Sequence, residues 1–206
     1  MEAPELKELH PLDIKQLTKT QQKIVDAALD LVSHVGYKST TTKKIADQAG
    51  VNETTIFKNF TSKQILIDTA YKQHTTQITD EVDEFFSHQF ENTEELMRKA
   101  GHFIAEMYHR HRTIVIGTVK EVGNENMKSI SNYKEDYVKN SLCKKLQSFS
   151  KEHTISDQEY ETMVYIFSGA ILSLLIDNVR KEYMEESDNN TVDLEDIIEM
   201  MLKVLA

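Results

Sequence analysis

The sequence predicts an all-α fold, with a small N-terminal helical domain followed by a larger helical domain. Only 6 glycines and 2 prolines occur in 206 residues, so residues that break helices are scarce. Apolar residues recur at helical spacing over most of the chain, and side chains that cap helices precede several of these runs. With 39% hydrophobic residues, the chain can also bury a substantial core.

The N-terminal part predicts successive helices that each begin behind a capping side chain: Thr18, Thr42, Asn52 and Ser62. The first helix is expected to end at Gly36. The second ends at Ala49, where Gly50 permits a tight turn. The third is short, over residues 53–59. The fourth runs towards Phe90 and has a polar middle at residues 72–77, which favours a bridge between two modules.

The rest of the chain predicts amphipathic helices that begin at Thr93 and that span 127–149, 158–183 and 194–205. Between them, residues 113–122 are rich in β-branched side chains and are compatible with a strand. We interpret this segment as helix because no partner strand is visible. A capping box of Ser156 and Glu159 marks the start of the 158–183 helix.

Charge is distributed unevenly along the chain. The net charge is -10, but residues 1–65 hold 9 Lys and 8 acidic residues, and residues 36–65 hold 5 Lys and 2 acidic residues. An acidic chain has no general affinity for nucleic acid, so any such contact must be local. We therefore expect a flexible arm at 1–17, a locally basic domain at 18–65 and an acidic domain at 66–206.

The single cysteine, Cys143, excludes an internal disulfide, and the N-terminus has no apolar stretch typical of a signal peptide. The most apolar segment, 163–176, is shorter than the roughly 20 residues of a membrane-spanning helix. We expect a cytoplasmic protein without a membrane segment. Cys143 could sense oxidants if it were exposed beside Lys144 and Lys145, but an inert thiol is the default.

Residues 41–60, TTKKIADQAGVNETTIFKNF, fit a helix-turn-helix: Ala46 lies between the helices, Gly50 in the turn and Ile56 as an apolar anchor. The run resembles the signature of the TetR family of transcriptional regulators. The positions that agree with this signature are Thr41, Thr42, Ile45, Ala46, Ala49, Gly50, Val51, Thr55, Ile56, Phe60, Ser62 and Lys63. The resemblance covers about residues 18–68.

The resemblance implies that this segment binds double-stranded DNA through Thr42, Lys43, Asn52, Glu53, Thr54, Thr55, Phe57, Lys58, Asn59 and Lys63. Lysines and helix N-termini suit phosphates, while Thr, Asn and Lys can address base edges. Two residues depart from the family pattern. Phe57 replaces a tyrosine whose hydroxyl reaches a phosphate, and Asn59 replaces a histidine.

The last two expected helices are apolar on several sides, so they must be covered on several sides. We interpret this as a symmetric dimer through a four-helix interface formed by Phe167, Ile171, Leu174, Leu175, Ile198, Met201 and Leu202. The alternative is that these residues form the core of the monomer.

The resemblance also implies a small-molecule effector bound among the central helices, with Phe103, Glu106, Met107, Tyr133, Tyr137 and Phe167 as candidate contacts. Core packing explains most of these residues equally well. His102, Glu106 and His109 share one helical stripe, as ligands of helical metal sites do. We nevertheless expect no metal and no cofactor, because only one such set occurs.

The sequence therefore predicts a ligand-responsive repressor that binds a palindromic operator as a homodimer. It has no nucleophile elbow, phosphate-binding glycine loop or distinctive carboxylate pair, so we do not expect an enzyme. One alternative is a DNA-bound adaptor controlled by a protein partner without a small effector. The other is a metal-binding or enzymatic helical bundle with an incidental helix-turn-helix.

Overall fold

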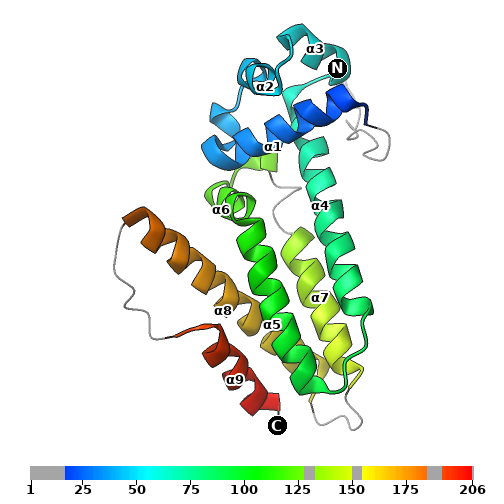
Figure 1. Cartoon of the computed structure of the whole chain (residues 1–206), viewed down its shortest axis with the longest axis vertical. Helices are drawn as coiled ribbons and strands as arrows, with labels where there is room; N and C mark the ends of the chain where they lie inside the picture. Colours follow the sequence, from blue (N-terminus) through cyan, green and yellow to red (C-terminus); the bar gives the residue numbers. More distant parts are fainter. Residues whose placement is uncertain (1–16, 128–132, 150–154, 185–191, 206) are drawn as a thin grey trace, which may run out of the picture. The chain divides into compact units, whose positions relative to one another are not determined.

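The computed structural model describes residues 17–127, 133–149, 155–184 and 192–205 (Figure 1). All regular elements in these ranges are helices, which confirms the all-α prediction. They are α1 (Lys19–Ser39), α2 (Thr42–Ala49), α3 (Glu53–Asn59), α4 (Lys63–Ser87), α5 (Thr93–Arg110), α6 (Arg112–Lys120), the 3-10 turn η2 (Glu125–Met127), α7 (Tyr133–Gln147), α8 (Asp157–Met184) and α9 (Leu194–Leu205). The expected arm lies outside these ranges except for Leu17.

In the N-terminal part the expected helix starts are confirmed with one correction. Both hydrogen bonds of the Thr18 capping box are present, and Asn52 caps α3. Ser62 Oγ accepts a hydrogen bond from the Ile65 N–H at 3.1 Å at the start of α4. The cap of α2, however, is Thr41, whose Oγ1 accepts from the Lys44 N–H at 3.2 Å, and not Thr42. Thr42 is the first residue inside the helix, which frees its hydroxyl for another partner. The helix expected over 127–149 is instead α7, Tyr133–Gln147, and Met127 belongs to the 3-10 turn η2.

Two segments were uncertain or differ from expectation: residues 113–122, which could have formed a strand, and the end of α1, which was expected at Gly36. Residues 113–122 fall largely within helix α6 and form no strand. In α1, helical geometry is interrupted at Gly36, whose φ of 81° lies in the left-handed region, and the chain resumes helical turns to Ser39. We call this kink, residues 36–40, the α1 corner. Buried Thr40 stabilises it, because its Oγ1 donates a hydrogen bond to the Gly36 carbonyl at 2.8 Å.

The chain divides into two compact units, each with its own core. The first comprises residues 1–77 and 117–132, and the second comprises 78–116 and 133–206. The first unit thus extends beyond the expected domain at 18–65, and α4 and α6 each contribute to both units. The first core joins α1, α2, α3 and the start of α4 around Ile24, Ala28, Ile45, Ile56, Phe60 and Leu66.

The second unit packs α5 against α7, α8 and α9, together with the end of α4. Its fully buried side chains include Leu96, Ile104, Leu142, Phe167 and Ile198. Gly101 lets α5 approach α9 closely, because an added Cβ would lie 2.8 Å from Ile198 Cδ1. The C-terminal helices are therefore part of the monomer core on one side.

Helix α8 is long and apolar enough to cross a membrane by length and composition over Asp157–Glu182. The helix extends beyond the apolar stretch 163–176, which by itself is shorter than a membrane-spanning helix. A third of the apolar window, 33%, is buried inside the protein, and core helices of non-membrane proteins meet the same criterion. The part of α8 that remains exposed therefore calls for a binding partner that covers it.

Candidate nucleic-acid interface and effector groove

Helices α2 and α3 are fixed to α1 by apolar anchors. Ile45 and Ala46 of α2 and Ile56 of α3 are buried in the first core, and Phe60 follows α3 with 1% of its surface exposed. Gly50 ends α2 with a φ of 67°, the left-handed conformation that the tight turn requires. The opposite faces of α2 and α3 are left free to meet a partner.

The outward face of α3 carries Thr54, Phe57 and Lys58, all exposed. Phe57 exposes 57% of its surface and is not part of the first core. The ammonium group of Lys58 lies in the last turn of the helix. This face combines one cation, one aromatic ring and the Thr54 hydroxyl, whose Oγ1 donates to Asn52 Oδ1 at 3.2 Å.

Other predicted DNA-binding residues already have partners within the unit. Thr42 Oγ1 donates to Glu53 Oε1 at 2.7 Å and so joins α2 to α3. Asn59 Nδ2 donates to the Thr55 carbonyl at 2.7 Å, one turn earlier. These side chains position the helices, and the Asn59 amide keeps its second N–H and its Oδ1 for another partner.

The lysines of the unit differ in availability. Lys43 is exposed. Lys44, which lies in the same TTKK run but was not among the residues predicted to bind DNA, is also exposed, and its Nζ donates to the Ser39 carbonyl at 2.9 Å. Lys63 is half-buried: its Nζ donates to the Tyr37 carbonyl at 2.5 Å and lies 4.0 Å from the centre of the Tyr37 ring. Burial lowers the pKa of Lys63, and the charge of Glu121 opposes that shift. Lys63 is thus tied to the α1 corner.

A polar cluster connects this corner to the segment after α6. The Tyr37 N–H donates to Glu121 Oε1 at 2.8 Å, and Tyr37 Oη donates to Gln64 Oε1 at 2.6 Å. Gln64 Nε2 in turn donates to the Asn126 carbonyl at 2.9 Å. No local sequence signal could have revealed the Tyr37–Glu121 contact, because 84 positions separate the two residues.

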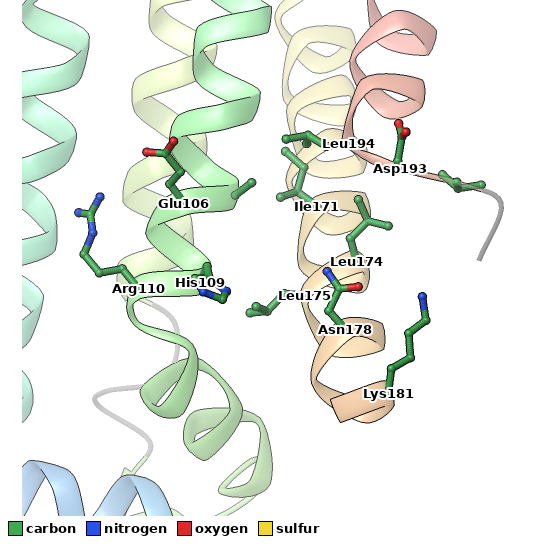
Figure 2. Close-up of a pocket in the computed structure, with 12 residues that line it drawn as sticks. Glu106, His109, Arg110, Ile171, Leu174, Leu175, Asn178, Lys181, Asp193 and Leu194 are labelled. Carbon is green, nitrogen blue, oxygen red and sulfur yellow. The ribbon is translucent and has the colours of Figure 1, made fainter. Parts of the chain in front are cut away.

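In the second unit, a groove of about 670 Å³ runs between α5, α8 and the start of α9 (Figure 2). Its apolar wall consists of Ala105, Ile171, Leu174, Leu175, Val192 and Leu194. Glu106 and Asp193 lie towards the α9 end, whereas His109, Asn178 and Lys181 lie towards the other end. Arg110 also borders the groove, and its guanidinium pairs with Glu81 at 2.6 Å. The volume suits a small ligand.

Among the predicted effector contacts whose side chains the structure describes, only Glu106 borders this groove. Phe103 stacks on Phe85 with ring centres 4.2 Å apart, and Tyr137 Oη donates to Asp83 at 2.5 Å. Met107 and Phe167 are buried in the second core. The side chain of Tyr133 is outside the described part of the chain. The structure therefore places most of these aromatic residues in packing contacts.

Most of the residues predicted for the dimer interface are buried within the single chain and are not exposed on its surface. Five of them are buried in the core of the chain itself: Phe167, Ile171, Leu175, Ile198 and Met201. Leu174 and Leu202 are half-buried. The apolar residues that remain exposed on α8 and α9 are Tyr165, Ile166, Ile176, Met184, Met200 and Val204. Sequence periodicity identified the apolar helices but not which side faces outward.

The remaining candidates form ordinary contacts. His102 Nε2 lies 2.9 Å from Glu195 Oε1 of α9, so it turns away from the rest of its stripe. Over the described residues, no set of three or more His, Cys, Asp or Glu side chains could hold a metal ion. Cys143 is buried, and burial together with Glu161 and Asp157 raises the pKa of its thiol. Its thiolate is disfavoured, which does not suit an oxidant sensor.

The geometry of the first unit is that of a helix-turn-helix DNA-binding domain. A family model for bacterial regulatory proteins of the tetR family matches residues 24–70. An uncharacterized HTH-type transcriptional regulator, YvkB of Bacillus subtilis, is 47% identical over 57 residues, which are 28% of this chain and 30% of the relative. The fatty acid metabolism regulator protein of Bacillus subtilis is 31% identical over 71 residues, 34% of this chain and 37% of the relative.

The chain thus matches about a third of the length of these curated relatives. The fold likeness extends further. The fatty acid degradation regulator FadR of Bacillus halodurans aligns with a TM-score of 0.67 at 17% identity, over 92% of this chain and 96% of the other. Residues 24–70 thus match the tetR family of bacterial regulatory proteins, which confirms the resemblance seen in residues 41–63, and the likeness over nearly the whole chain shows the fold.

Proposed function

We propose that the protein is a ligand-responsive repressor that binds a palindromic operator as a homodimer. The observation that carries this proposal is the free outward face of α3 beside exposed lysines of α2, on a unit whose other side is packed around α1. Lys43 and Lys44 can neutralise phosphates, while Thr54 and Lys58 reach base edges. Two such faces, about 34–36 Å apart, would enter successive major grooves.

The homodimer rests on the exposed apolar face of α8 and α9. Along α8, Tyr165, Ile166 and Ile176 recur at the spacing of one helix face, and Gly169 between them meets nothing within 4 Å. Met200 and Val204 continue this surface on α9. A second copy would cover these side chains and would explain why so apolar a helix is only partly buried.

We place the effector in the groove between α5 and α8. Two of the similar proteins are named as fatty acid regulators, and the groove has an apolar wall with basic groups at one end. An acyl chain along Ile171 and Leu174, with an anionic head near His109 and Lys181, fits this distribution. The proposed ligand class is therefore a long-chain fatty acid or its thioester.

Release of DNA requires that ligand and DNA favour different conformations, with a coupling of order 1–3 kcal/mol. Helices α4 and α6 can carry it, because each begins in one compact unit and ends in the other. At the end of α6, Glu121 holds the N–H of Tyr37 next to the kink of α1. A shift of α6 would change this contact.

The decisive test is binding of the purified protein to its own upstream DNA at two salt concentrations, with an unrelated duplex as competitor. Specific binding that weakens steeply with salt supports the proposal. Lys43→Ala should weaken binding to all sequences, and Lys58→Ala should relax base preference, whereas Lys72→Ala, an exposed lysine of α4, should do neither.

Addition of a long-chain acyl ligand should then raise the melting temperature and release the operator. Leu174→Glu, which places a charge in the apolar wall, should abolish this response without loss of operator binding. Specific DNA binding that no small molecule changes, together with a co-purifying protein, would favour the adaptor function instead.

A further inference from the structure

Phe57 is exposed on the recognition helix without a role in holding that helix in place. Ile56 and Phe60, its neighbours in the first core, expose 0% and 1% of their surfaces, against 57% for Phe57. Phe57 is not part of that core. Within residues 17–77, the only other large apolar side chain that is exposed is Val35 of α1, at 46%. Packing inside the unit therefore does not explain this phenylalanine.

The chemistry of the ring limits what it can contact on DNA. A phenyl group has no donor or acceptor for a phosphate oxygen or a polar base edge. The apolar group that the major groove presents is the 5-methyl of thymine, which apolar side chains contact in direct readout. Thr54, one turn earlier, and Lys58, the next residue, lie on the same outward face. The ring is therefore presented together with side chains suited to base edges.

We propose that Phe57 is a specificity determinant that recognises thymine through its 5-methyl group. This inference rests on the proposed operator binding and adds the base that this position selects. Replacement of thymine by uracil removes that methyl and leaves the hydrogen-bonding edges and the phosphates unchanged. The uracil substitution therefore distinguishes a contact of Phe57 with the thymine methyl, which it removes, from a contact with deoxyribose, which it leaves unchanged.

The experiment uses the full chain and a duplex that the wild-type protein selects from a pool of random sequences. Dissociation constants are compared for this duplex and for its uracil form, at one salt concentration. Burial of one methyl corresponds to about fourfold in affinity, so two half-sites should give about fifteenfold weaker binding of the uracil duplex. Single uracil substitutions then locate the position.

Phe57→Ala should bind the thymine and uracil duplexes equally, and Phe57→Leu should retain part of the preference. Val35→Ala, the matched exposed apolar control, should keep the full wild-type ratio. A wild-type protein that is indifferent to uracil, or an Ala variant that keeps the wild-type ratio, would overturn the assignment while operator binding stands. If the wild-type protein selects no sequence at all, the proposed function fails as well.

Discussion

Gly117 of α6 lies against the backbone of α1, and this contact predicts a measurable loss of stability on Gly117→Ala. An added Cβ would lie 2.8 Å from the Ser33 carbonyl oxygen and 2.9 Å from Ser33 Cα. These atoms belong to a helix backbone and cannot rotate away, so we take the upper part of the range for overpacking, about 2–3 kcal/mol. The higher helix propensity of alanine relative to glycine offsets about 1 kcal/mol of this loss. The expected net destabilisation is about 1–2 kcal/mol.

Urea unfolding followed by circular dichroism, with hydrogen exchange of α1 and α6, measures this change. The comparison variant is Gly101→Ala in α5, where the three atoms nearest to the Cβ would all belong to side chains: Ile198 Cδ1 at 2.8 Å, Ile198 Cγ1 at 2.9 Å and Phe167 Cζ at 3.2 Å. We expect that variant to be less destabilised than Gly117→Ala. Equal stability of Gly117→Ala and wild type, with unchanged exchange in α1, would refute the packing argument.

Further predictions concern charge, the α1 corner and assembly. Burial raises the pKa of the Asp68 carboxyl from its usual 3.8, so the folded protein loses stability as the pH rises above that value. Asp68→Asn should therefore be more resistant to urea than the wild type at pH 7, and this difference should disappear in acid. Glu121→Ala should cost about 1–3 kcal/mol by removing the acceptor of the Tyr37 N–H, and Glu121→Gln should restore most of it in the same urea assay. Ile166→Glu should be a monomer in analytical ultracentrifugation. The control Val122→Glu introduces the same charge at a position that is 78% exposed and should remain a dimer. A dimeric Ile166→Glu variant would contradict the proposed interface.

Most of the helices and the DNA-binding motif can be predicted from the amino-acid sequence alone. Capping pairs such as Thr18 with Gln21 act within a few residues, and the left-handed turn at Gly50 depends on one residue. The bounds of α3 could therefore be predicted to the residue, and the apolar repeat from Leu194 to Leu205 spans α9. Short-range hydrogen bonding and backbone sterics are local, so they can be recognised without the fold.

Which side of each helix faces outward depends on how the helices pack against one another in the fold. Residues Phe167 and Ile166 are adjacent and both apolar, yet one is fully buried and the other is 55% exposed. Periodicity cannot distinguish the two on a helix that is apolar on several sides, because the choice depends on where α5 and α9 pack. The same holds for the Glu121 contact with Tyr37 and for the groove beside α8, which bring together residues that are distant in sequence.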